Sequence, residues 1–170
     1  RIDIVRKSGF NTAESEELLN LSIVEFTLES YESAEELIQK STDKLNIFIY
    51  EEINATIKNI NNLRNISLEN NLNITRLEDT INNAKKLDVT DLKKINVLKQ
   101  EFSSLNKSVY MLIEAKNEIK SMEDAGFPTT RVSNVLNEAK FALELGYYDK
   151  IDDIIKNIKK LKSKAFELNT

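Results

Sequence analysis

The 170-residue chain contains no cysteine, histidine or tryptophan, only three glycines and a single proline. Between Gly9 and Gly126, 116 consecutive residues include neither glycine nor proline. Sandwiches and barrels of β-strands need a tight turn roughly every 8–12 residues, usually made with glycine, Asn-Gly or proline. The scarcity of these residues therefore excludes such all-β folds.

The absence of histidine and cysteine also removes most catalytic and metal chemistry. A Ser-His-Asp triad, an HExxH zinc site and a carboxylate–histidine di-iron site all need histidine. The sequence has no glycine-rich phosphate loop and no EF-hand spacing. Adjacent acids such as Glu35-Glu36 and Asp152-Asp153 point in different directions on a helix and do not form an acid/base pair. We therefore expect no enzyme activity, no cofactor and no metal site.

The bulk composition favours a helical protein with much surface for each residue. Hydrophobic residues make up 41% of the chain and charged residues 31%, too apolar for a disordered chain and rather charged for a compact sphere. The net charge of −4 argues against nucleic acid as a partner, because binding it needs a concentrated basic face. The sequence has no run of 18 apolar residues, so we expect membrane contact only through a segment outside this chain.

Apolar residues recur at helical spacing through most of the chain. From residue 91 to 124 they occupy two heptad rows: Ile95, Phe102 and Val109 on one, and Leu98, Leu105, Leu112 and Ile119 on the other. This alternating spacing is typical of a coiled-coil seam. The sequence predicts short helices at about 13–29, 75–87 and 130–145, and long helices at 32–64, 91–124 and 149–169. The expected fold is an all-α, elongated helical bundle of alternating short and long helices with coiled-coil-like seams.

An internal repeat organises these helices. Residues 9–12 (Gly-Phe-Asn-Thr) match residues 126–129 (Gly-Phe-Pro-Thr), and the same offset of 117 places Tyr31 on Tyr148. A third copy begins at Asn71. We expect one helical domain over 1–170, with repeat units at about 9–70, 71–125 and 126–170. Because residues 2–8 precede Gly9 as residues 119–125 precede Gly126, we expect the chain to begin in a preceding long helix and to be a fragment of a larger protein.

Charge is spread unevenly along the chain. Residues 11–39 contain eight acidic residues and no basic one, whereas residues 154–164 contain five lysines and no acid. Three interpretations remain open: ordinary solvated faces, ends that attract each other within or between molecules, and a basic helix that touches anionic lipid. The candidate partner-contact residues are Glu14, Glu17, Glu25, Glu32, Glu36, Lys156, Lys159, Lys160 and Lys164.

Residues 135–152, Val-Leu-Asn-Glu-Ala-Lys-Phe-Ala-Leu-Glu-Leu-Gly-Tyr-Tyr-Asp-Lys-Ile-Asp, carry a family resemblance. They are similar to tetratricopeptide hairpins, but the repeat period of 55–62 residues differs from that family. The stretch more closely resembles long helix-pair repeat regions of uncharacterised archaeal membrane-anchored or surface proteins. The resemblance implies a helical repeat and assigns no functional residue.

These observations favour a non-catalytic structural or protein-interaction module, a spacer or scaffold of a larger and membrane-tethered protein. The partner would be another protein or a second copy, bound through helix faces. The alternative is a helical carrier that holds an apolar ligand between splayed helices. Five Asn-x-Ser/Thr sequons weakly favour a location at the cell surface or on a membrane, and a cytoplasmic location stays open.

Overall fold

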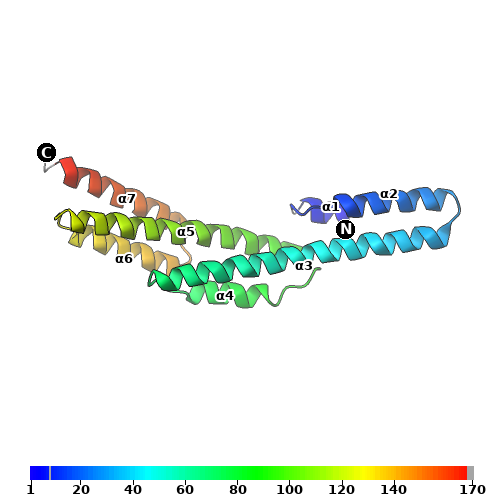
Figure 1. The fold of residues 1–170 in the computed structure, drawn as a ribbon, viewed down its shortest axis with the longest axis horizontal. Coiled ribbons are helices and arrows are strands. Elements are labelled where there is room, and N and C mark those ends of the chain that lie inside the picture. The colour runs from blue at the N-terminus through cyan, green and yellow to red at the C-terminus, as the bar shows by residue number, and fades with distance from the viewer. Residues whose placement is uncertain (8, 168–170) are drawn as a thin grey trace. The chain divides into compact units, whose positions relative to one another are not determined.

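The computed structural model describes residues 1–7 and 9–167, with side chains up to residue 164. Over this part of the chain the fold is all-α, as the sequence predicts, with seven helices and no strand (Figure 1). The helices are α1 (Ile2–Lys7), α2 (Ala13–Thr27), α3 (Tyr31–Glu69), α4 (Thr75–Ala84), α5 (Leu92–Asp124), α6 (Thr130–Leu145) and α7 (Tyr148–Glu167). Among the described residues, none of these helices combines the length and apolar character needed to cross a bilayer.

The described residues pack as two compact units. Unit 1 comprises residues 1–58 and 84–98, and unit 2 comprises residues 59–83 and 99–170, of which the last three are not described. Helices α3 and α5 each contribute residues to both units. The single domain and the elongated shape expected from the sequence stay predictions.

Unit 1 has its core where α1, the middle of α3 and the start of α5 meet. Eight buried residues form this cluster: Val5, Phe10, Leu45, Ile49, Ile53, Val89, Leu92 and Ile95. Helix α2 packs on the first part of α3 through small polar residues instead. Ser15 and Ser22 of α2 are buried, and the Ser41 hydroxyl of α3 donates to the Ser15 carbonyl at 2.7 Å. Small side chains let the two helices approach closely, but they bury little apolar surface.

Unit 2 is built around α5, α6 and α7. The five-residue connection between α5 and α6 forms a helical hairpin, and α6 also packs against α7. Helix α7 is joined to α5 by ion pairs, among them Lys159–Glu114 at 3.1 Å and Lys107–Asp152. Helix α6 buries five residues between its neighbours: Val132, Leu136, Ala139, Ala142 and Leu143.

The same C-terminal turn closes α1, α3 and α5. In each, one residue adopts positive φ, namely Gly9 (+81°), Asn71 (+55°) and Gly126 (+80°). Its amide donates to the carbonyl three residues back, and the next amide donates to the carbonyl five residues back, which is a Schellman motif. Asparagine tolerates the left-handed region better than most residues with a side chain, so it replaces glycine in the middle copy. With this turn α3 ends at Glu69, five residues later than expected.

Threonine is a preferred N-cap residue and stands directly before α2 and α6, as Thr12 and Thr129. Neither Thr12 nor Thr129 makes a side-chain cap bond. Instead, Asn11 and Asn73 each accept a hydrogen bond from the backbone amide two residues later, at 3.1 and 2.8 Å. Asparagine competes well for this role because its short amide side chain readily closes an Asx turn. Before α5, Asp91 accepts hydrogen bonds from Lys94 and from the Asp88 amide, which lower the pKa of its carboxyl group.

Candidate functional site

The acidic candidates all lie in unit 1. Glu14 pairs with Lys44 at 3.0 Å and joins α2 to α3, whereas Glu36 pairs with Lys40 at 3.5 Å along α3. Three further candidates contribute charge to the surface of the hairpin: the exposed Glu17 and Glu32, and the half-buried Glu25. These carboxylates therefore make the α2–α3 hairpin strongly acidic.

The basic candidates all lie on α7 of unit 2. Lys159 pairs with Glu114 of α5, and Lys156 pairs with Asp153 on its own helix at 3.3 Å. Lys160 and Lys164 are exposed. The described partners of both charge clusters come from within their own units, so the suggestion that the two stretches attract each other stays a prediction.

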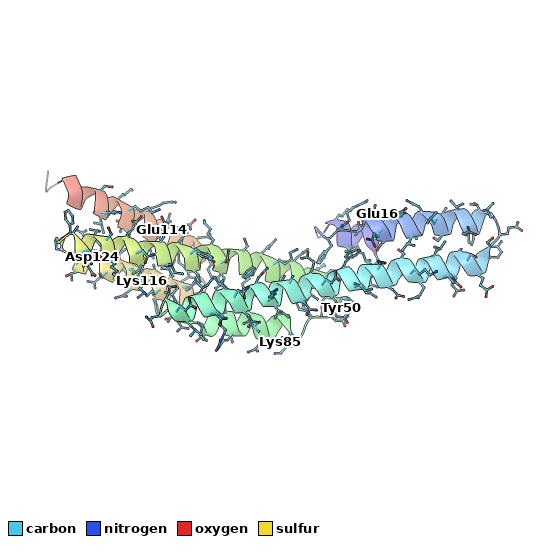
Figure 2. All side chains as sticks on the ribbon, viewed as in Figure 1. Glu16, Tyr50, Lys85, Glu114, Lys116 and Asp124 are labelled. Atoms are coloured by element: carbon cyan, nitrogen blue, oxygen red, sulfur yellow. The ribbon has the colours of Figure 1, made fainter. Side chains whose placement is uncertain are left out.

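The most unusual surface of unit 1 is an exposed apolar face on α2 that the charge pattern did not reveal. Apolar residues occur on every side of this 15-residue helix, but only one side packs against α3. Side chains project from α2 away from α3 (Figure 2). We define the α2 apolar face by the exposed residues on one side of the helix, Leu19, Ile23 and Phe26, with Tyr31 and Ile38 of α3. Leu21, Val24 and Leu28 are exposed on the opposite side.

This face carries a well-formed aromatic pair at the tip of the hairpin. The rings of Phe26 and Tyr31 meet edge to face, with their centroids 5.3 Å apart. Both side chains stay exposed, at 62% and 59% of their full surface. Several large apolar side chains together on one small hairpin form the kind of patch that usually marks a contact surface.

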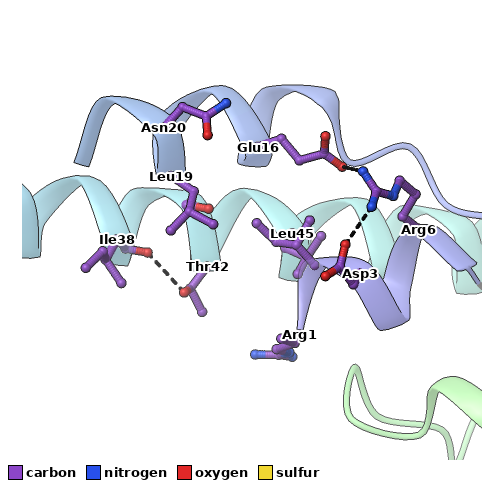
Figure 3. Close-up of a pocket in the computed structure, with 11 residues that line it drawn as sticks. Arg1, Asp3, Arg6, Glu16, Leu19, Asn20, Ile38, Thr42 and Leu45 are labelled. Carbon is purple, nitrogen blue, oxygen red and sulfur yellow. Dashed lines mark hydrogen bonds and ion pairs between the residues drawn. The ribbon is translucent and has the colours of Figure 1, made fainter. Parts of the chain in front are cut away.

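At the other end of the α2 apolar face lies a groove between α2 and α3, with α1 seated at its mouth (Figure 3). The hollow has a volume of about 380 Å³. Leu19 and Ile38 line it from the two helices, Asp3 lines it from α1, and Arg1 lines it from the position just before α1. Arg6 joins α1 to α2 by pairing with Glu16 at 3.3 Å, and it also pairs with Asp3 of its own helix at 2.6 Å.

Unit 2 has a polar cluster at the start of α7, which acts as a brace. Arg76 pairs with Glu101 at 2.9 Å and donates from Nε to the Tyr148 hydroxyl at 3.5 Å. The Tyr148 hydrogen bond raises the pKa of Arg76, and burial raises the pKa of Tyr148. Both shifts keep Arg76 charged and Tyr148 neutral at neutral pH, which are the states in which they form this hydrogen bond. This indicates a structural role for the cluster.

The interaction candidates chosen from charge did not include Leu19, Phe26 or Ile38. A signal for them was present in the sequence, because residues 18–28 place apolar side chains at almost every helical angle. A helix that is apolar all round needs neighbours on several sides, and in unit 1 α2 packs on α3 through one side only.

The chain was compared with protein-family models, with curated proteins and with solved structures. None of the three comparisons finds a match.

Proposed function

We propose that this chain is a non-catalytic protein-interaction module in which packed helices present the α2 apolar face to a protein partner. The observation that carries the proposal is the exposure of that face: Phe26 is 62% exposed and Ile23 55%. Leaving such side chains in water costs about 1.5–3 kcal/mol for each one relative to full burial. A surface of this kind is stabilised when a partner covers it.

The scaffold role is supported by the rest of the molecule. The chain has no histidine, the most common general base in enzymes, and no cysteine, a common nucleophile. Its long helices α3 and α5 have 39 and 33 residues. Such helices hold a binding hairpin rigidly, and rigid presentation lowers the entropy cost of association.

A peptide-display selection tests this function. Random helical peptides are selected on the 170-residue chain and then measured against two variants, Phe26→Ser on α2 and Phe141→Ser on α6. Phe141 is a matched control because it is exposed to the same degree, 60%, and lies in unit 2. Binders that lose affinity for the Phe26 variant alone support the proposal. If the selection yields no binders, or binders indifferent to Phe26→Ser, the α2 apolar face is not the interaction surface.

A further inference from the structure

Unit 2 contains a covered counterpart of the α2 apolar face. When the sequence is shifted by 117 residues, the start of α2 falls on the start of α6 and the start of α3 falls on the start of α7. Helix α1 falls on the last six residues of α5. The positions that face the hairpin partner are buried in both copies. Three apolar positions differ sharply in exposure: Leu19 (36%) and Leu136 (6%), Phe26 (62%) and Leu143 (3%), and Ile38 (49%) and Ile155 (2%).

Helix α5 explains this difference. It runs beside α7 and forms a hairpin with α6. Two ion pairs join α5 to α7: Glu114 with Lys159, and Lys107 with Asp152. Leu136, Leu143 and Ile155, which correspond to Leu19, Phe26 and Ile38, are therefore buried beneath a helix. Among the residues of unit 1 that the structure describes, α1 occupies this position, and only at its end.

Helix α1 sits on α3 as the end of α5 sits on α7. Arg1 donates to the Asn46 side chain at 2.8 Å, and Glu118, the counterpart of Arg1 in unit 2, pairs with Lys162 of α7 at 3.9 Å. The groove of Figure 3 begins at Arg1 and continues between Leu19 and Ile38. Its geometry thus matches a helix that lies in line with α1, antiparallel to α2 and parallel to α3.

The charged lining of the groove is balanced, with Arg1 and Arg6 against Asp3 and Glu16, so an acid beside it on α3 sets the chemistry of the occupant. Asp152, which pairs with Lys107 of the covering helix, corresponds to Glu35, which has no ion-pair partner among the described residues. The lysines that pair with Glu114 and Glu118 of the covering helix correspond to Thr42 and Leu45. A helix in this groove therefore gains from a basic residue opposite Glu35, whereas acids opposite Thr42 and Leu45 would lack the lysines that pair with Glu114 and Glu118 in unit 2.

From this comparison we propose that the groove between α2 and α3 binds a basic amphipathic helix of a partner protein. The proposal rests on the proposed function and adds the chemistry and direction of the partner. Leu19, Phe26 and Ile38 contact the apolar side of that helix, and Glu35 pairs with its basic side. A second copy of the hairpin fits poorly, because it would bring a second set of the eight acids of residues 11–39 to the same interface.

The test uses a probe taken from the covering helix itself. The native probe is a labelled peptide of residues 99–117, and the basic probe carries Glu101→Lys and Glu114→Lys. Binding to the 170-residue chain is measured by fluorescence anisotropy at low and high salt. We expect the basic probe to bind at least about 5-fold more tightly than the native probe at low salt, and most of this gain to disappear at high salt.

Matched variants of the chain locate the binding site. Phe26→Ser should weaken the basic probe about 10-fold or more, because it removes a large apolar contact, whereas Phe141→Ser leaves binding unchanged. Glu35→Gln should weaken it about 2- to 5-fold, whereas Glu51→Gln, also at an exposed position of α3, leaves binding unchanged. Circular dichroism confirms that each variant keeps its helices.

Four outcomes would overturn the proposal: no binding of the basic probe, equal binding of both probes, binding that Phe26→Ser does not change, or a dimer of the chain that this variant dissociates. A further protein carries the basic probe fused to Arg1. If the groove is occupied only in this fusion, its occupant is a covalently attached segment and not a partner protein, which also overturns the proposal.

The peptide selection separates the two proposals. Selected binders that depend on Phe26 but are not basic helices refute this inference and leave the proposed function standing.

Discussion

Glu29 occupies a backbone conformation that disfavours any residue with a side chain, so its replacement by glycine should stabilise the protein. It lies in the turn after α2 with φ +63°, and the corresponding residue after α6 is Gly146 with φ +74°. The amides of Glu29 and of Ser30 donate to the carbonyls of Phe26 and Glu25 in the same Schellman pattern that closes α6. The two turns thus differ chiefly in whether a side chain is present at the left-handed position.

The expected gain follows from two opposing terms. The left-handed conformation costs a residue with a Cβ about 1–2 kcal/mol. Glycine loses more backbone freedom on folding, which offsets about 0.5–1 kcal/mol of that gain. Glu29→Gly should therefore raise the free energy of unfolding by about 0.5–1 kcal/mol, equivalent to a rise of about 1–4 °C in Tm for a chain of this size.

Thermal and urea unfolding followed by circular dichroism measure this effect. Glu29→Ala is the control, because it removes the carboxylate from the C-terminal end of α2 but keeps the Cβ. Gly146→Ala should lower the stability by about 1–2 kcal/mol, and more than Gly126→Ala does. A Cβ at residue 146 meets Arg76 at 3.2 Å, whereas one at residue 126 meets nothing within 4 Å. A Glu29→Gly protein no more stable than the Glu29→Ala protein would refute the reasoning.

Two further predictions use the same comparison of units and the pKa shifts. Leu136→Ala should cost about 2–3 kcal/mol in urea unfolding and Leu19→Ala less than about 1 kcal/mol, because Leu136 is 6% exposed and Leu19 36%; equal losses would mean that Leu19 is also covered in solution. Burial raises the pKa of Tyr148, so its contribution to stability is complete below its ordinary pKa of about 10 and is lost as the pH rises through the folded-state value. Tyr148→Phe should therefore flatten the fall in urea midpoint between about pH 9.5 and 11.5, and an unchanged slope would contradict this assignment.

The sequence by itself determined the helical class and most helix boundaries. Its scarcity of glycine and proline left no turn chemistry for a β-fold, and heptad spacing indicated the long helix that spans Leu92–Asp124 in the structure. The boundaries were good where a glycine or asparagine fixes positive φ, as at Gly126 and Gly146. Helix ends of this kind are set by local backbone conformation, so the residues around each end are enough to predict it.

The exposed state of α2 was decided only by the tertiary structure. Leu19 and Leu136 share a residue type and a position in the sequence offset, yet one is exposed and the other buried. Periodicity shows which side chains need cover, but it does not count the helices available to supply it. That number depends on which distant segments pack together. In unit 2, α5 covers the whole length of the hairpin groove, whereas in unit 1 the described helix α1 covers only one end of it. The sequence thus marks α2 as a helix that needs cover, and only the tertiary structure shows that Leu19 lacks it.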